Sequence, residues 1–258
     1  MKFKKILTIG INESKLDPEY WKLVNSFSEK RISLPKDSTE IKKHLSDTDC
    51  LLVNPFVFKV DKEIIDTAPN LKYIGVLATG YGAVDSSYAT TKNITVCNIP
   101  GYSTESVAEL AFAAILEYIR DIEHAKQIVR KGDYTDVPRF PVYEIKDKNF
   151  GIIGLGRIGS RIGELALAFG AHVSYWSKNR KPKLEAKGIE YQEIEKILSH
   201  CDFISLNLSL NKETEGFLNE PRIKKIKSGA VLLNLAPNEL VDFSALEKRL
   251  SGGGILST

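Results

Sequence analysis

Three glycines spaced as G-x-G-x-x-G carry the most specific chemical signal in this chain. Gly154, Gly156 and Gly159 follow a short apolar run and precede apolar residues at helical spacing, the order of a strand, a turn and a helix. The first glycine permits the tight turn, the second lets backbone N–H groups approach a pyrophosphate, and the third lets the helix pack on its strand. A phosphate would then lie at the positive end of the helix. Because a second strand is expected at residues 171–176, the pattern predicts a dinucleotide site.

The residues after that second strand bear on which nicotinamide dinucleotide is bound. A site that prefers NAD(H) places an acid about 20 positions beyond the glycines, whereas an Arg nearby accommodates a 2′-phosphate. The stretch Trp176-Ser-Lys-Asn-Arg-Lys181 contains no acid. Ser177 can hydrogen-bond a phosphate oxygen, and Lys178 and Arg180 supply positive charge. We therefore predict NADP(H) over NAD(H), with a solvated basic turn as the alternative.

The elements that must position these loops alternate between strand and helix, which predicts parallel α/β sheets. The turn-rich segment 131–141 is expected to be a loop. The expected strands are 6–9, 50–53, 73–77, 94–97, 150–153, 171–176, a short one near 189, 202–208 and 230–235, and a further strand begins after residue 252. The expected helices begin near Asp17, Ser38 and Asp61, continue with a long helix at 103–120 capped by Ser103 or Thr104, and end with 158–169, 194–198, 220–226 and 244–250.

The composition is that of an ordinary globular protein. The 258 residues are 43% hydrophobic and 27% charged, and the net charge of +3 comes from basic residues interspersed with acids, which argues against nucleic-acid binding. Cys50, Cys97 and Cys201 lack metal-ligand spacing, so we expect buried free thiols in a reducing cytoplasm and no metal site. The longest apolar helical segment, around 110–119, is too short to cross a membrane.

Several separated blocks of the chain resemble the D-isomer-specific 2-hydroxyacid dehydrogenases, in family order. These blocks are residues 69–85, 96–109, 151–159, 202–216 and the residues around 233–242. The residues of these blocks are most similar to those of the glycerate/hydroxypyruvate and glyoxylate reductase branch. The resemblance implies two Rossmann-like α/β domains. A flavodoxin-like substrate domain at 1–98 would precede a doubly wound, parallel-sheet NAD(P)-binding domain at 99–258, which includes a bridging helix from about residue 103.

The resemblance also implies roles for particular residues. Backbone N–H groups of Thr79 and Gly80 would bind the carboxylate of a small 2-oxoacid or 2-hydroxyacid of the glyoxylate or hydroxypyruvate type. The alternative is that Gly80 and Gly82 only turn the chain. Thr104 and Val107 would touch the nicotinamide end of the cofactor; a helix cap and a core residue are the alternatives. Further implied cofactor contacts are Gly154, Gly156, Arg157, Ile158, Gly159, Asn207, Thr214, Leu235 and Ala236, although Asn207 and Ser209 stand where the family usually has His and Pro.

The catalytic groups implied by the family do not match this sequence. The family's Arg lies in an Asn-x-x-Arg-Gly stretch, where this chain has Pro237 and Asn238, and its Glu–His pair, last strands and returning helix would lie beyond Thr258. None of the four histidines is a convincing substitute, so no catalytic residue is assigned. We expect an oxidoreductase of this family with impaired activity, dimeric through its nucleotide domain. The alternatives are a non-catalytic dinucleotide-binding protein for redox sensing or interaction, and a remnant that binds no ligand.

Overall fold

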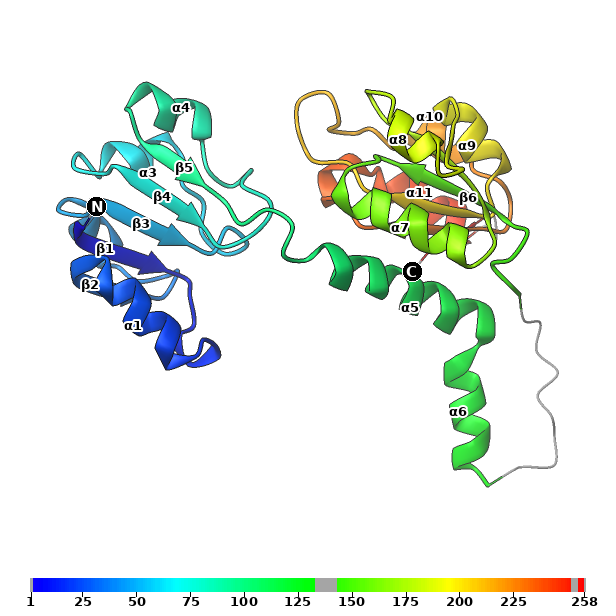
Figure 1. Ribbon diagram of the computed structural model, residues 1–258, viewed down its shortest axis with the longest axis horizontal. Coiled ribbons are helices and arrows are strands. Elements are labelled where there is room, and N and C mark those ends of the chain that lie inside the picture. Colours follow the sequence, from blue (N-terminus) through cyan, green and yellow to red (C-terminus); the bar gives the residue numbers. More distant parts are fainter. Residues whose placement is uncertain (1, 133–142, 252–254, 258) are drawn as a thin grey trace. The chain divides into compact units, whose positions relative to one another are not determined.

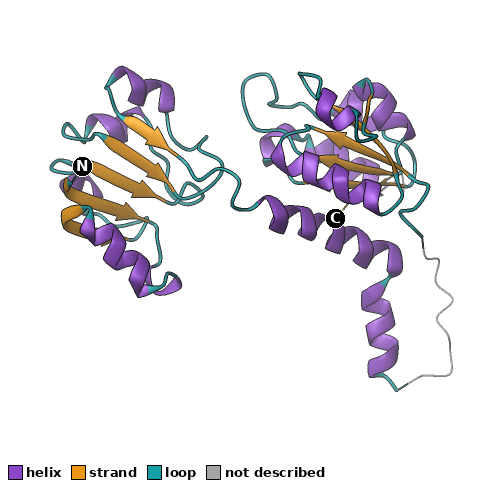
Figure 2. Ribbon diagram, viewed as in Figure 1, coloured by secondary structure: helices purple, strands orange, loops and turns teal. Residues whose placement is uncertain are grey.

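The computed structural model describes residues 2–132, 143–251 and 255–257, and the chain divides into two compact units, Met1–Tyr102 and Ser103–Thr258 (Figure 1). Each unit contains one sheet whose strand pairs are all parallel (Figure 2). Most of the segment 131–141, expected to be a loop, lies outside the described residues. Within the described residues, no helix is long and apolar enough to cross a membrane.

The first unit is a five-stranded sheet in the order β2-β1-β3-β4-β5. This is the flavodoxin-like order, in which the second strand lies at one edge and the first strand beside it. The predicted fold class is therefore confirmed for this unit. Its elements are β1 (Phe3–Ile9), a 3-10 turn (Glu13–Lys15), α1 (Pro18–Ser26), β2 (Ser28–Leu34), α2 (Ile41–Leu45), β3 (Cys50–Val53), α3 (Lys62–Asp66), β4 (Tyr73–Val76), α4 (Ser86–Thr91) and β5 (Thr95–Cys97).

Aspartate side chains cap α1 and α3 of this unit, as the sequence predicted at Asp17 and Asp61. The Asp17 carboxylate accepts from the Glu19 N–H at 2.9 Å, and Pro18 occupies the first turn of α1. Asp61 accepts in the same way from the Ile64 N–H at 3.1 Å. The prediction for Ser38 was wrong, because α2 begins three residues later, at Ile41.

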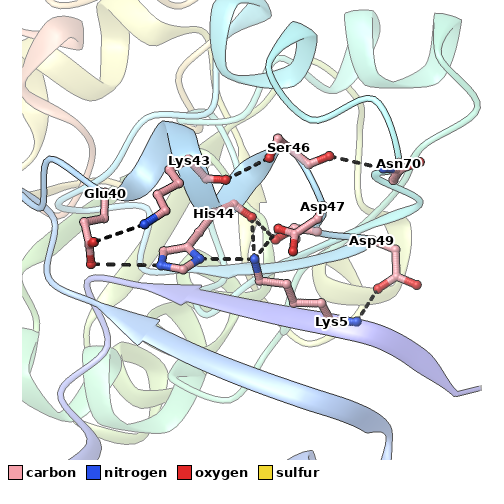
Figure 3. Close-up of polar contacts among 9 residues, drawn as sticks. Lys5, Glu40, Lys43, His44, Ser46, Asp47, Asp49 and Asn70 are labelled. Atoms are coloured by element: carbon pink, nitrogen blue, oxygen red, sulfur yellow. Dashed lines mark hydrogen bonds and ion pairs between the residues drawn. The ribbon is translucent and has the colours of Figure 1, made fainter.

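A buried lysine stabilises the amino-terminal edge of the first sheet (Figure 3). Lys5 is only 4% exposed, and its ammonium donates to the His44 carbonyl at 2.9 Å and to the Asp47 carboxylate. Nδ1 of His44 lies 3.2 Å from the same ammonium and must accept, since an ammonium can only donate. The Lys4 and Lys5 N–H groups donate to Asp49 at 3.0 and 2.9 Å. The buried charge is therefore paired, and His44 has a structural role.

The second unit is a six-stranded sheet in the order β11-β10-β9-β6-β7-β8. Counted from β6, this is the order 3-2-1-4-5-6 of a doubly wound dinucleotide-binding sheet, so this part of the predicted fold class is also confirmed. Its elements are α5 (Thr104–Arg120), α6 (Ile122–Arg130), β6 (Asn149–Ile153), α7 (Arg157–Ala168), β7 (His172–Trp176), α8 (Pro182–Glu185), β8 (Glu190–Tyr191), α9 (Ile194–His200), β9 (Phe203–Leu206), α10 (Glu220–Lys225), β10 (Ala230–Asn234), a 3-10 turn (Asn238–Leu240), α11 (Phe243–Ser251) and β11 (Ile255–Ser257).

Two hydrophobic cores cover the two faces of this sheet. Phe112 on α5 and Ile162 on α7 pack with Phe150 and Tyr175 on one face. On the other face, α9, α10 and α11 pack against alternate residues of the same strands, such as Ile153 and Leu206. Because both faces are covered, β6, β9 and β10 are buried over consecutive residues and do not alternate between buried and exposed ones.

Other features of the fold also differ from the expectations drawn from the sequence. Strand β2 was not predicted, and neither was α6, which follows α5 after Asp121 takes a left-handed backbone conformation with φ +46°. The expectation that all three cysteines are buried was wrong for Cys97, which is exposed, whereas Cys50 and Cys201 are buried. Burial raises the pKa of Cys50 to about 12 and that of Cys201 to about 11, so neither thiol is a reactive thiolate near neutral pH.

Candidate functional site

The glycine turn joins β6 to α7 at the carboxyl edge of the second sheet. Gly154 has φ +98°, and its N–H donates to the Trp176 carbonyl at 2.8 Å. A Cβ at this position would lie 2.9 Å from the carbonyl carbon of Asn207, beyond the end of β9. Both the left-handed backbone and this close contact therefore require glycine here.

The other two glycines of the motif have opposite surroundings. A Cβ on Gly159 would lie 2.2 Å from the Gly154 carbonyl oxygen, so glycine is required for the close approach of α7 to the turn. Gly156 is the N-cap of α7, and a Cβ there would meet no atom within 4 Å in the part of the chain that the structure describes. Gly156 has no side chain that could cap α7, and within the described residues the structure records no hydrogen bond from the Arg157 and Ile158 N–H groups in its first turn. A phosphate would fit there.

A fourth glycine, not singled out from the sequence, also determines how α7 packs. A Cβ on Gly163 would lie 2.8 Å from Ile189 and 3.0 Å from Ile152. Its spacing of four residues after Gly159 places it on the same helix face, and this spacing was the available signal.

Three residues of the basic loop after β7 (residues 177–181) were predicted to contact the cofactor, and all three already have hydrogen-bond or ion-pair partners within the chain: Ser177, Lys178 and Arg180. The Ser177 hydroxyl donates to the Asn179 carbonyl at 2.6 Å. Lys178 pairs with Glu213 at 2.5 Å, and Arg180 pairs with Glu185 through Nε at 2.9 Å and Nη2 at 2.5 Å. The hexapeptide contains no acid, but the fold brings two acids to it from elsewhere in the chain. Sequence reasoning missed both.

Loops after β9 and β10 form the neighbouring part of the same edge. The Asn207 N–H donates to the Ile153 carbonyl at 2.8 Å, which holds Asn207 beside the glycine turn. Its Nδ2 donates to the Ser205 carbonyl at 3.1 Å, whereas its Oδ1 is buried and accepts no hydrogen bond from the described residues. Thr214 is held by its own loop, because its hydroxyl donates to the Ser209 carbonyl at 2.7 Å. The Leu235 N–H donates to the Leu206 carbonyl at 3.0 Å, and Ala236 follows it.

The start of α5 lies beside the start of α7. Nε of Arg161, in the first turns of α7, donates to the Glu105 carboxylate at 2.7 Å. Thr104 and Val107 flank Glu105 in the first turn of α5, and both are half-buried. Thr104 and Val107 therefore lie at the end of α5 that contacts α7, the helix that follows the glycine turn.

Thr79 and Gly80 follow β4 in the first unit, at the carboxyl edge of its sheet. The Asn98 side chain donates to the Thr79 carbonyl at 2.6 Å, and the Thr79 hydroxyl donates to the Ile99 carbonyl at 3.3 Å. A Cβ on Gly80 or Gly82 would meet no atom of the described residues within 4 Å. Steric contacts within the chain therefore do not explain why glycine stands at either position.

No catalytic group was assigned from the sequence, and several of the residues weighed for that role lie in different parts of the second unit. Pro237 and Asn238 are exposed at the start of a short 3-10 turn after β10. His172 and His200 lie at the opposite, amino-terminal edge of the second sheet, where they line an open cavity of about 310 Å³. Among the described residues, no group of His, Cys, Asp and Glu could hold a metal ion.

Comparison with known proteins assigns this arrangement to a family. Residues 112–257 match the family model described as D-isomer specific 2-hydroxyacid dehydrogenase, NAD binding domain. The chain belongs to this family. The resemblance seen in the sequence is confirmed, and the glycine turn lies within the matched domain of the 2-hydroxyacid dehydrogenases.

Similar proteins include two curated reductases and one solved structure. The chain is 36% identical to the hydroxypyruvate reductase of Blautia hydrogenotrophica over 85% of its own length and 69% of that protein's. It is 40% identical to the glyoxylate reductase of Thermococcus litoralis over 79% of its own length and 64% of that protein's. The D-lactate dehydrogenase from Aquifex aeolicus, complexed with NAD and lactic acid, matches with a TM-score of 0.87 and 29% identity over 97% of this chain and 74% of that one.

The residues at the glycine turn fit the nicotinamide dinucleotide that this domain binds. The uncapped start of α7 offers N–H donors to phosphate, and the space above Gly156 is open. The buried Oδ1 of Asn207 lacks a donor among the described residues, and a cofactor hydroxyl could provide one. Both observations concern atoms beside Gly154, so they point to a single binding site.

Proposed function

We propose that this chain binds NADP(H) at the glycine turn and acts on small 2-oxoacids or 2-hydroxyacids of the glyoxylate or hydroxypyruvate type. The observation that carries the proposal is the start of α7, where two sterically required glycines flank an open, uncapped helix N-terminus. The names of the two curated relatives support the choice of substrate class.

The preference for NADP(H) rests on this chain's own residues, because the Aquifex structure holds NAD. Lys178 and Arg180 are exposed at the end of β7, where a ribose 2′-phosphate would lie. Each already pairs with a carboxylate, so a phosphate would use the N–H groups that those acids leave unused. Ser177 supplies a hydroxyl in the same loop.

The loop at Thr79 and Gly80 is the proposed site for the substrate carboxylate. The absence of a steric need for glycine at 80 and 82 favours close approach by a ligand over a purely structural turn. The bound nicotinamide would supply or accept the hydride. The chain's own backbone N–H groups would hold the acid.

We further propose that the 258-residue chain reduces these acids slowly and that dinucleotide binding is its main retained property. Pro237 cannot replace a guanidinium, which would grip the carboxylate through two parallel hydrogen bonds. Removing a single preorganised donor from an active site typically costs roughly 3–4 kcal/mol of transition-state stabilisation. A non-catalytic role in redox sensing or interaction is the second candidate, and the substitution at Pro237 favours it.

Steady-state assays with glyoxylate and hydroxypyruvate, together with equilibrium binding of NADPH, test this function. We expect saturable NADPH binding with turnover far below the ~10 s⁻¹ that is typical of enzymes. Turnover in that range would overturn the proposed impairment. Failure to bind NADPH or NADH would overturn the proposed function altogether and leave only shared ancestry.

We also propose that the chain forms a homodimer through its second unit. Helix α6 has no buried residue, although Ile122, Ala125, Ile128 and Val129 lie on one face of it. Leu110 on α5 is 62% exposed and adds to the uncovered apolar surface. A second copy would bury these side chains.

A further inference from the structure

Arg180 is held more firmly than a surface arginine normally is. Its Nε and Nη2 both donate to Glu185, at 2.9 and 2.5 Å, and its guanidinium carbon lies 4.6 Å from the centre of the Tyr191 ring. A two-pronged ion pair fixes the direction of the guanidinium, and the ring supports its face. Arg180 therefore has a defined orientation although it is exposed.

The acid that holds Arg180 is itself held by a buried tyrosine. The Tyr175 hydroxyl donates to Glu185 at 2.6 Å and accepts from the Lys181 N–H at 2.7 Å. Tyr175 is fully buried, and Tyr191 packs edge-on against it with the ring centres 5.4 Å apart. The Arg180 and Tyr175 contacts lower the pKa of Glu185 to about 2, so the acid stays ionised. We call Tyr175, Glu185 and Tyr191 the arginine bracket.

The bracket leaves part of the guanidinium available to a ligand. A guanidinium carries five N–H groups in a plane, and Glu185 takes one from Nε and one from Nη2, along one side. The three N–H groups that Glu185 does not use include a pair at the tip, from Nη1 and Nη2. Such a pair matches two oxygens of a phosphate.

Lys178, the second cation predicted to meet the 2′-phosphate, has no comparable support. It pairs with Glu213 at 2.5 Å, and the two side chains are 72% and 67% exposed. The Lys stem is flexible and its ammonium is a point charge, so this pair does not impose a direction on a ligand. Of the two cations predicted to meet the 2′-phosphate, Arg180 is oriented and Lys178 is not, and each pairs with one glutamate.

We propose that the arginine bracket positions Arg180 for the 2′-phosphate of NADP(H), and that Glu185 therefore determines cofactor specificity without touching the cofactor. The inference rests on the NADP(H) preference proposed above and extends it to residues outside the binding loop. Glu185 acts through Arg180 and is a positioning residue.

Removing the Glu185 charge distinguishes positioning from simple electrostatics, because the two predict opposite signs. An acid beside a phosphate site repels the phosphate, so electrostatics alone predicts that Glu185→Gln tightens NADPH binding. If Glu185 instead positions Arg180, the same variant loosens the guanidinium and weakens NADPH binding relative to NADH. Glu213→Gln is the matched control, since it removes the same charge from the mobile cation Lys178 and should leave the selectivity unchanged or raise it.

The experiment measures dissociation constants of NADPH and NADH for the full 258-residue chain by fluorescence titration, with thermal unfolding without cofactor as a check of folding. We expect Glu185→Gln to lower the ratio of NADPH to NADH affinity about five- to tenfold, because Arg180 keeps its charge and loses only its fixed direction. Tyr191→Leu should lower the ratio in the same direction, whereas Tyr191→Phe, which keeps the ring, should not. If Glu185→Gln does not fold, the comparison of Tyr191→Leu with Tyr191→Phe tests the inference instead.

Three outcomes would overturn the inference. Selectivity in Glu185→Gln equal to or above that of the wild type would remove the role of the bracket while leaving the NADP(H) preference intact. Equal losses of selectivity in Glu185→Gln and Glu213→Gln would show that the effect is not specific to the arginine bracket and would overturn its role. A wild-type chain without any NADPH preference would overturn the proposed preference and the bracket together.

Discussion

Gly156→Ala separates the binding role of the glycine turn from its structural role. The Gly156 backbone has φ −81° and ψ −160°, which alanine can adopt, and a Cβ there meets no protein atom within 4 Å. The added methyl would instead enter the space in front of α7, where a phosphate would lie. Gly159→Ala is the contrasting variant, because its methyl would lie 2.2 Å from the Gly154 carbonyl oxygen.

The expected magnitudes differ between the two variants. For Gly156→Ala, a small N-cap penalty is offset by the lower entropy of the unfolded chain, so the free energy of unfolding should change by less than about 1 kcal/mol. For Gly159→Ala, the steric overlap should cost at least about 1–3 kcal/mol. Loss of one charge-assisted contact to phosphate is worth about 1.5–3 kcal/mol, so Gly156→Ala should weaken NADPH binding about 10- to 100-fold.

Urea unfolding monitored by tryptophan fluorescence gives the stabilities, and NADPH titration of the folded chains gives the affinities. We expect Gly156→Ala to unfold like the wild type and to lose binding, and Gly159→Ala to lose both stability and binding. NADPH affinity within about threefold of the wild type in Gly156→Ala would contradict the phosphate site at α7. Destabilisation of Gly156→Ala as large as that of Gly159→Ala would contradict the open space above residue 156.

Three further predictions concern catalysis, assembly and stability. The double variant Pro237→Arg with Asn238→Gly restores the family's charged position and should raise NADPH-dependent reduction of glyoxylate at least about tenfold, measured by loss of absorbance at the nicotinamide band; an unchanged rate would contradict the importance given to Pro237. Val129→Glu places a charge on the apolar face of α6 and should convert a dimer to a monomer in sedimentation velocity, whereas a wild-type monomer would refute the proposed interface. The hydrogen bond from Lys5 lowers the pKa of Asp47, so its stabilisation is present at neutral pH and is lost as the pH falls through that lowered pKa. Asp47→Asn should therefore lower the Tm at pH 7 and flatten the dependence of Tm on pH below about 4; a Tm at pH 7 equal to that of the wild type would contradict this role.

The glycine turn and the architecture of its sheet could be predicted because their signals are local. The strand, the three glycines and the helix lie within 20 consecutive residues. Gly159 is required by a contact inside that stretch, and Gly154 by its left-handed backbone, although the close contact of Gly154 is with Asn207 outside it. The buried strands β3 and β10 were also predicted closely, since a parallel sheet covered on both faces gives uninterrupted apolar runs.

Elements at the margins of the fold gave weaker signals. Strand β2 begins Ser28-Glu-Lys-Arg31 and pairs only with β1, so as an edge strand it needs few apolar residues. Helix α6 was missed because the turn before it depends on Asp121, a non-glycine residue in a left-handed conformation, which sequence alone does not indicate.

The partners of the basic loop could not be predicted because they come from other elements. Glu185 lies on α8 and Glu213 in the loop after β9, 35 positions beyond its partner Lys178. Such contacts depend on how the loops return to one edge of the sheet, and a pattern within six residues contains no information about them. The same limit applies to Tyr191, whose position under Arg180 follows from the pairing of β7 with β8.

Equilibrium titration of the 258-residue chain with NADPH and with NADH, under identical salt and pH, tests most directly whether the glycine turn binds NADP(H). We predict saturable binding of one NADPH per chain, at least about tenfold tighter than NADH. Tighter binding of NADH, or no binding of either nucleotide, would contradict the function proposed for this turn.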